Sequence, residues 1–156
     1  MASPRDAVAG ADIICTTTPS REPVLLGQWL SPGAHINAVG ASQPPARELD
    51  AQAVVMSRMF VDWKESTVKE AADYLFPLNE GAIQESHIIG NIGDMSLGKI
   101  RGRQSREEIT LFKAVGLAVE DLAAAGYVWR KAVMNGAGTA IEFGGRHFDG
   151  TTNQET

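Results

Sequence analysis

The sequence predicts an α/β protein: short parallel strands joined by helices and links, followed by one long helix. Three short apolar runs, residues 11–18, 34–39 and 59–62, end at Pro, Gly or charged residues, as buried parallel strands do. A later run, residues 113–134, carries apolar residues at helical spacing. Strands separated by helices or links predict a parallel sheet with right-handed crossovers. Three parallel strands are half of a doubly wound sheet.

Composition narrows the class of protein. The 156 residues suit one domain of ordinary size. With Lys+Arg 14 against Asp+Glu 19, the net charge of −5 argues against nucleic acid as a partner. One cysteine, Cys15, excludes a disulfide framework, and no apolar run reaches the ~20 residues of a membrane span. We therefore expect a cytoplasmic protein with no membrane partner.

The remaining elements are predicted in chain order. Pro4 and Gly10 suit the ends of a short first helix, and a second helix is expected over residues 47–54. Helical stretches are predicted over residues 67–75 and 81–88, a basic loop over 99–107 and a strand over 109–112. The long helix 113–134 would be followed by a strand at 139–143 and a loose tail at 144–156.

Small, hydroxylic or charged residues follow each of the first three strands, namely residues 16–20, 39–42 and 62–65. In a parallel sheet these ends meet at one edge, where ligands bind. Small residues let a flat ring approach the backbone, and hydroxyls can bond a ribose or an amide. Ordinary turn chemistry explains the same residues, and the pattern alone leaves both interpretations open.

Other chemistry-bearing residues form no recognisable site. His35, His87 and His147 lack metal-ligand spacing and are predicted to be structural or exposed. Cys15 is predicted to be a buried, inert thiol. The basic stretch is predicted to be a solvated loop. Charged residues spaced three and four apart would form surface ion pairs or line a cleft; they are Lys64, Glu65, Lys69, Glu70 and Asp73.

Several ordered motifs resemble the ornithine cyclodeaminase/mu-crystallin family over residues 4–143. They are ADIICTTT (11–18), EPVL (22–25), PGAHINAVGA (32–41), RELD (47–50), VD (61–62) with KE (69–70), EITLFK (108–113) and VED (119–121). The resemblance implies binding of NAD or NADP, an amino acid or cyclic imine as substrate, and a homodimer. Residues 1–95 would be the C-terminal half of a Rossmann-like NAD(P)-binding domain. Residues 96–143 would be a returning segment with the long helix, part of a dimerisation/substrate domain.

The resemblance also implies site residues. Lys113 and Ala114 would approach the nicotinamide ring from the returning segment, and Glu70 would lie on the substrate side. Lys113 and Glu70 are thus the candidate catalytic residues. The candidate cofactor-binding residues, at the nicotinamide end, are Thr16, Thr17, Thr18, Val39, Gly40, Ala41, Ser42 and Ala114.

Two departures from the family pattern shape the expected function. Ser42 stands where the cyclodeaminases carry a catalytic Asp, which favours imine reduction or amino-acid dehydrogenation over cyclodeamination. The family's glycine-rich phosphate loop, catalytic Lys and carboxylate-binding Arg lie upstream of the matched region, so the chain resembles the C-terminal half of a member. We expect the isolated chain to be inactive, to bind NAD(P)H weakly or not at all, and to self-associate. The alternatives are a non-catalytic, mu-crystallin-like ligand-binding or dimerisation module and a truncated product without activity.

Overall fold

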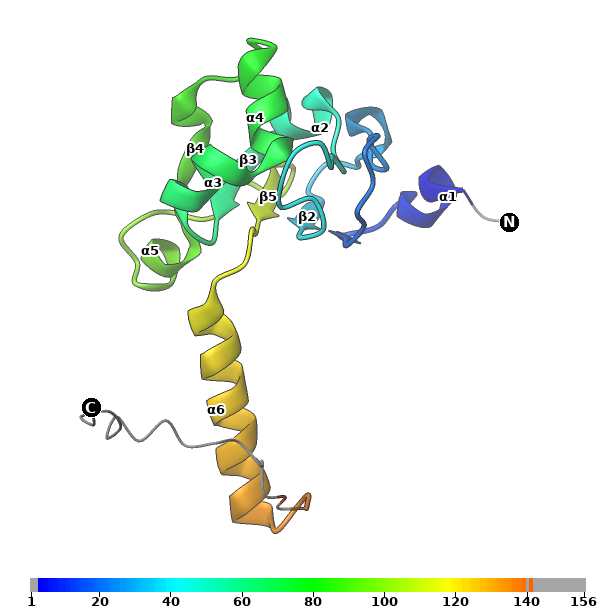
Figure 1. Ribbon diagram of the computed structural model, residues 1–156. Coiled ribbons are helices and arrows are strands. Elements are labelled where there is room, and N and C mark those ends of the chain that lie inside the picture. Colours follow the sequence, from blue (N-terminus) through cyan, green and yellow to red (C-terminus); the bar gives the residue numbers. More distant parts are fainter. Residues whose placement is uncertain (1–2, 140, 142–156) are drawn as a thin grey trace, which may run out of the picture. The chain divides into compact units, whose positions relative to one another are not determined.

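The computed structural model describes residues 3–139 and 141, and its strands form one five-stranded sheet (Figure 1). All strand pairs are parallel, and the order across the sheet is β1-β2-β5-β3-β4. The predicted α/β class and parallel sheet are therefore confirmed. The strands are β1 (Ile13–Thr16), β2 (His35–Ala38), β3 (Ser57–Val61), β4 (Ile88–Asn91) and β5 (Ile109–Lys113).

Six α-helices and two 3-10 turns lie within the described residues. They are α1 (Pro4–Val8), α2 (Ala51–Val55), α3 (Lys64–Glu70), α4 (Ala72–Asn79), α5 (Ile92–Ser96) and α6 (Ala118–Asn135), with η1 (Gly27–Trp29) and η2 (Glu85–His87). The second helix begins later than predicted because Asp50 caps it, its side chain accepting from the Ala53 amide. Leu49, just before this cap, is extended and forms a parallel bridge with Leu25.

Two predicted helical boundaries are wrong. Residues 81–88 do not form an α-helix: Gly81 has a φ of 72°, and only the short 3-10 helix η2 forms within this range before the chain enters β4. The long helix does not begin at Lys113, because this residue is still paired in β5 with Ala38 and Val61. Gly116, with a φ of 93°, separates that strand from α6.

The chain divides into two compact units, residues 1–118 and 119–156. The first contains the whole sheet, including β5, so the predicted boundary at residue 95 separates this strand from its neighbours. The functional assignment of residues 96–143 stays a prediction. The second unit is built on α6, in which no residue is buried. None of the helices within residues 3–139 combines the length and hydropathy needed to span a membrane. The predicted strand at 139–143 and the tail fall largely or wholly outside the described residues.

One row of side chains across the sheet forms the centre of the core. Strand register aligns Ile14, Ile36, Leu111, Met59 and Ile88, all of which are buried. The neighbouring helices α2 and α4 (Figure 1) supply core residues to the same hydrophobic cluster, Val54 from α2 and Tyr74 from α4. This face of the sheet is therefore the packed one.

The opposite face is open at β1, which lies at the sheet edge and pairs only with β2 among the described strands. Ile13 is 67% exposed, and Cys15 is exposed as well. The prediction of a buried thiol is wrong because only the Ile14 and Thr16 side of this strand is covered.

Arg103 corrects the interpretation of the basic loop as merely solvated. Its guanidinium donates to the carbonyl oxygen of Gly33 at 2.6 Å and to Thr110 Oγ1 at 3.0 Å. Thr110 in turn lies 2.8 Å from His35 Nδ1. One arginine of the loop therefore fastens it to the amino ends of β2 and β5.

The aligned apolar row predicts a large effect of shortening Leu111. Leu111→Ala should lower the free energy of unfolding by about 3 kcal/mol, because the side chain is fully buried in the middle strand and leaves a cavity. Urea denaturation measures it. Ile13→Ala is the matched control on an exposed strand position and should cost less than about 1 kcal/mol. Equal losses in the two variants would contradict this packing.

Candidate functional site

The carboxyl ends of β1 and β2 lie against one another. The amides of Val39 and Gly40 both donate to the Thr16 carbonyl oxygen, at 3.0 and 3.2 Å. A Cβ on Gly40 would overlap the backbone nitrogen and oxygen of Thr18. Glycine is thus required at this position by the close approach of two backbones.

A buried carboxylate, that of Glu48, joins these two strand ends. It accepts hydrogen bonds from the Thr16 hydroxyl at 2.8 Å and from the backbone amide of Thr18. From the second loop it accepts the amides of Gly40 at 2.9 Å and Ala41 at 3.3 Å. The residue is 0% exposed. The donors that face the carboxylate belong to the last residue of β1 or to the loops that follow β1 and β2.

These hydrogen bonds decide the ionisation state of Glu48. Burial raises its pKa, but the donors from Thr18, Thr16 and Gly40 outweigh burial and leave the pKa below its ordinary value. The group is therefore a carboxylate at neutral pH. Its contribution to stability is complete above the pKa of the unfolded chain and is lost as the pH falls through the lower pKa of the folded one.

Asp62 performs a similar task at the ends of β3 and β5. One of its oxygens accepts the amides of Val115 and Gly116, both at 2.8 Å, and the other accepts the Trp63 amide at 2.7 Å. Asp62 is 4% exposed. The segment that leaves β5 toward α6 is therefore anchored to the end of β3.

Lys113 lies in the interior behind these loops. Its ammonium nitrogen is 3.2 Å from Asp73 Oδ2, and both side chains are fully buried. The other oxygen of Asp73 accepts the amides of Glu48 and Leu49, each at 2.9 Å. Burial raises the pKa of Asp73, although Lys113 and these amides act in the opposite direction. Lys113 thus supports the segment that carries Glu48.

The structure brings together most of the candidate cofactor-binding residues. The Ala114 amide donates to the Ala38 carbonyl oxygen at 3.1 Å, which places the returning segment beside the second loop. Thr16, Ala41 and Ala114 are buried, Thr18, Gly40 and Ser42 are partly exposed, and Thr17 and Val39 are exposed. Their role in binding stays a prediction.

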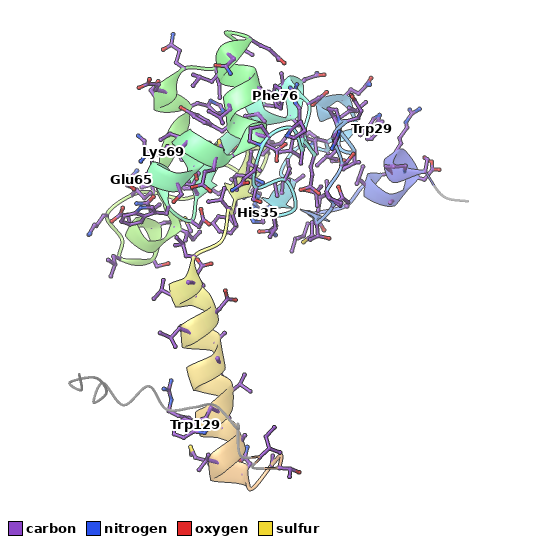
Figure 2. All side chains as sticks on the ribbon, in the orientation of Figure 1. Trp29, His35, Glu65, Lys69, Phe76 and Trp129 are labelled. Atoms are coloured by element: carbon purple, nitrogen blue, oxygen red, sulfur yellow. The ribbon has the colours of Figure 1, made fainter. Side chains whose placement is uncertain are left out.

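The remaining candidate, Glu70, is partly exposed at the end of α3, and no hydrogen bond among the described residues involves its carboxylate. Glu65 and Lys69 lie on the outer side of the same helix (Figure 2). Of the charged residues that the sequence spaces three and four apart, Asp73 is buried in the core. Lys64 and Glu65 border a hollow together with Tyr74 and Glu85. These charged residues therefore do not form one cluster, because they lie partly at the surface, partly beside a hollow and partly in the core.

A mainly apolar hollow of about 300 Å³ adjoins the first loop. It is bordered by Pro4, Ala7 and Val8 of α1, by residues 14–18, and by Val24 and Leu25. A second hollow, of about 610 Å³, lies at the opposite edge of the sheet and includes Ser57, Arg58 and Glu108. Of these two hollows, the one beside α1 contacts the candidate cofactor-binding residues Thr16, Thr17 and Thr18.

Sequence reasoning missed the roles of Glu48, Asp62 and Asp73 in this arrangement. Glu48 appears in the sequence analysis only as part of a motif, Asp62 only as part of a motif and of the charged residues after the third strand, and Asp73 only as one of several charged helix residues. One signal for the burial of Glu48 was present in the sequence, because Glu48 directly precedes the apolar Leu49 and the N-cap Asp50. Within the described residues, no cluster of His, Cys, Asp and Glu side chains is grouped to hold a metal ion.

An open parallel sheet whose carboxyl edge carries small and hydroxylic loops places the chain among the α/β proteins that bind ligands at this edge. Comparison with known proteins identifies it more narrowly. The family model of the ornithine cyclodeaminase/mu-crystallin family matches residues 1–136, and the chain belongs to this family.

Individual relatives agree with that assignment. A Delta(1)-pyrroline-2-carboxylate reductase of Bacillus cereus is 42% identical over 143 residues, which cover 91% of this chain and 44% of the relative. The ketimine reductase mu-crystallin of Mus musculus is 42% identical over 127 residues, covering 81% and 38%. The Thermococcus litoralis Delta(1)-pyrroline-2-carboxylate reductase in complex with NADH and L-proline superposes with a TM-score of 0.82 at 42% identity, covering 90% and 44%. The chain thus spans less than half the length of these relatives.

The buried ion pair predicts a large loss of stability for Lys113→Met. The variant leaves Asp73 buried without its cation, and the free energy of unfolding should fall by about 3 kcal/mol. Lys99→Met is the matched control, since Lys99 pairs with Asp94 at the surface, and it should cost less than about 1 kcal/mol. Chemical denaturation of both variants measures the difference. Wild-type stability of Lys113→Met would show that the pair does not support the fold.

Proposed function

We propose that this chain supplies the nicotinamide-side part of an NAD(H)- or NADP(H)-dependent reductase of cyclic imines, or of a related amino-acid dehydrogenase. One observation carries the proposal: Glu48 joins two loops rich in small and hydroxyl-bearing residues at the carboxyl edge of a parallel sheet. The 42% identity to enzymes named as pyrroline-2-carboxylate reductases supports this choice of reaction.

The residues present fit the neutral end of a dinucleotide better than its phosphates. Phosphate sites need free backbone amides, but those of Thr18, Gly40 and Ala41 already donate to Glu48. A carboxylate beneath the loops also repels an anion. The hydroxyls of Thr17 and Ser42 remain on exposed or partly exposed residues and suit the carboxamide or ribose. We therefore assign these loops to the nicotinamide side.

The dinucleotide, when bound, supplies or accepts the hydride. The chain's own residues hold the ring against the loops and exclude water from one side of it. Ser42 carries no carboxylate that can act as a base at neutral pH, which supports imine reduction or amino-acid dehydrogenation over cyclodeamination. Glu70 and Lys113 stay the proposed catalytic candidates, with Lys113 engaged by Asp73 in the state described.

A second proposal concerns self-association, and α6 supports it. This helix has no buried residue, and Leu122, Trp129 and Val133 are 72%, 67% and 65% exposed. Their spacing of seven and four residues places them on one helix face. Such a face favours association with a second copy of the chain, in a homodimer that we place in the cytoplasm. A non-catalytic dimerisation or ligand-binding module is the alternative function that this surface favours.

The proposed cofactor site predicts where NADH acts on the chain. Titration with millimolar NADH should shift amide NMR signals of residues 16–18, 39–42 and 114, and binding should be weak because the phosphates find no free amide cluster here. Phosphate alone is the control and should leave these signals in place. Micromolar affinity, or shifts confined to the hollow beside Arg58, would contradict the proposal.

The exposed face of α6 predicts concentration-dependent association. Sedimentation velocity should show species larger than the monomer for the wild type, and a Leu122→Ser/Trp129→Ser variant should remain monomeric because it removes apolar surface. Glu120→Ser/Lys131→Ser, which changes two exposed charged residues of the same helix, is the matched control. A monomeric wild type at every concentration would sink the proposal.

A further inference from the structure

We propose that Glu48 is the positioning residue of the cofactor site: its carboxylate sets the spacing between the loop after β1 and the loop after β2. This inference rests on the proposed function, because the spacing between the loops matters only if both loops contact the same cofactor. Glu48 need not touch the cofactor. It acts through the two loops that it joins.

The division of its hydrogen bonds supports this role. The Thr16 hydroxyl comes from the last residue of β1 and the Thr18 amide from the loop that follows it, while the amides of Gly40 and Ala41 come from the loop after β2. A residue that served only to stabilise its own segment would bond within that segment. Glu48 instead reaches back 32 residues to Thr16.

Glu48 is itself held from behind. Its backbone amide and that of Leu49 donate to Asp73, which is paired with Lys113 of β5. Leu49 is also bridged to Leu25. Because backbone and carboxylate are both tied, the distance between the loops follows from packing in the core rather than from the loops themselves.

The tight approach at Gly40 leaves little tolerance in this arrangement. A Cβ on Gly40 would meet Glu48 Oε1 at 2.5 Å and would also overlap the Thr18 backbone. The two loops therefore pass one another at backbone contact. A small displacement of the carboxylate separates the exposed Thr17 from the partly exposed Ser42, two hydroxyl-bearing residues that the proposed function assigns to one ligand.

Glu48→Gln tests the inference, because it keeps the shape but turns an NH₂ group toward N–H donors. We expect the amides of Thr18, Gly40 and Ala41 to exchange with deuterium at least about tenfold faster than in the wild type. We also expect the NADH-induced shifts at Thr17 and Ser42 to disappear. Asp50→Asn is the matched control: it weakens bonds to the amides of Gly27 and Ala53 and should leave the loops and these shifts unchanged.

Thr16→Val keeps the test decisive if Glu48→Gln does not fold. It removes one of the four bonds to the carboxylate and should produce the same changes at smaller size. Wild-type exchange and wild-type NADH shifts in either folded variant would overturn the inference. The same loss of shifts in Asp50→Asn would also overturn it, since general destabilisation would then explain the effect.

The two proposals fail in different ways. If NADH shifts no loop signal of the wild-type chain, the proposed function fails. If the wild type responds and Glu48→Gln responds equally, the proposed function stands and the role of Glu48 alone is refuted.

Discussion

The burial of one ionised carboxylate between two strand ends is the constraint on which the rest of the site depends. An unpaired carboxylate would be expensive at the position of Glu48, so the chain must bring enough donors to it. Four donors, one from the end of β1 and three from the loops after β1 and β2, meet this need, and in meeting it they fix where each loop lies. The need of the buried carboxylate for hydrogen-bond donors therefore determines how the two loops are placed at the surface.

The sheet register extends this constraint into the core. Beyond the apolar row of Ile14, Ile36 and Leu111, the next residues on the same face of each strand form a second row, which includes Thr16, Ala38 and Lys113. Thr16 bonds Glu48, and Lys113 pairs with Asp73, which holds the backbone of Glu48. A polar layer thus lies between the hydrophobic core and the loops at the carboxyl edge of the sheet. Its charges are satisfied internally, and the exposed or partly exposed loop residues above it include Thr17, Val39 and Ser42.

The fold class and the place of the loops could be predicted from the sequence because both follow from local patterns. Short apolar runs stopped by Pro or Gly indicate parallel strands, and parallel strands bring their carboxyl ends to one edge. β4 escaped prediction because Ile88 and Ile89 are followed at once by Gly90, which leaves too short a run to tell a strand from a helix end. The burial of Glu48 and Asp73 depends largely on distant contacts, such as those of Glu48 with Thr16 and of Asp73 with Leu49 and Lys113, which no local pattern contains.

The most direct test of this account is the detection of scalar couplings across the hydrogen bonds of Glu48 in the wild-type chain. With a ¹³C-labelled side-chain carboxylate, correlations should appear between its carbon and the amide nitrogens of Thr18 and Gly40, which lie on different loops. Correlations to both amides would demonstrate that one carboxylate joins the two strand ends. The absence of any correlation between this carboxylate carbon and the two amide nitrogens would contradict the account.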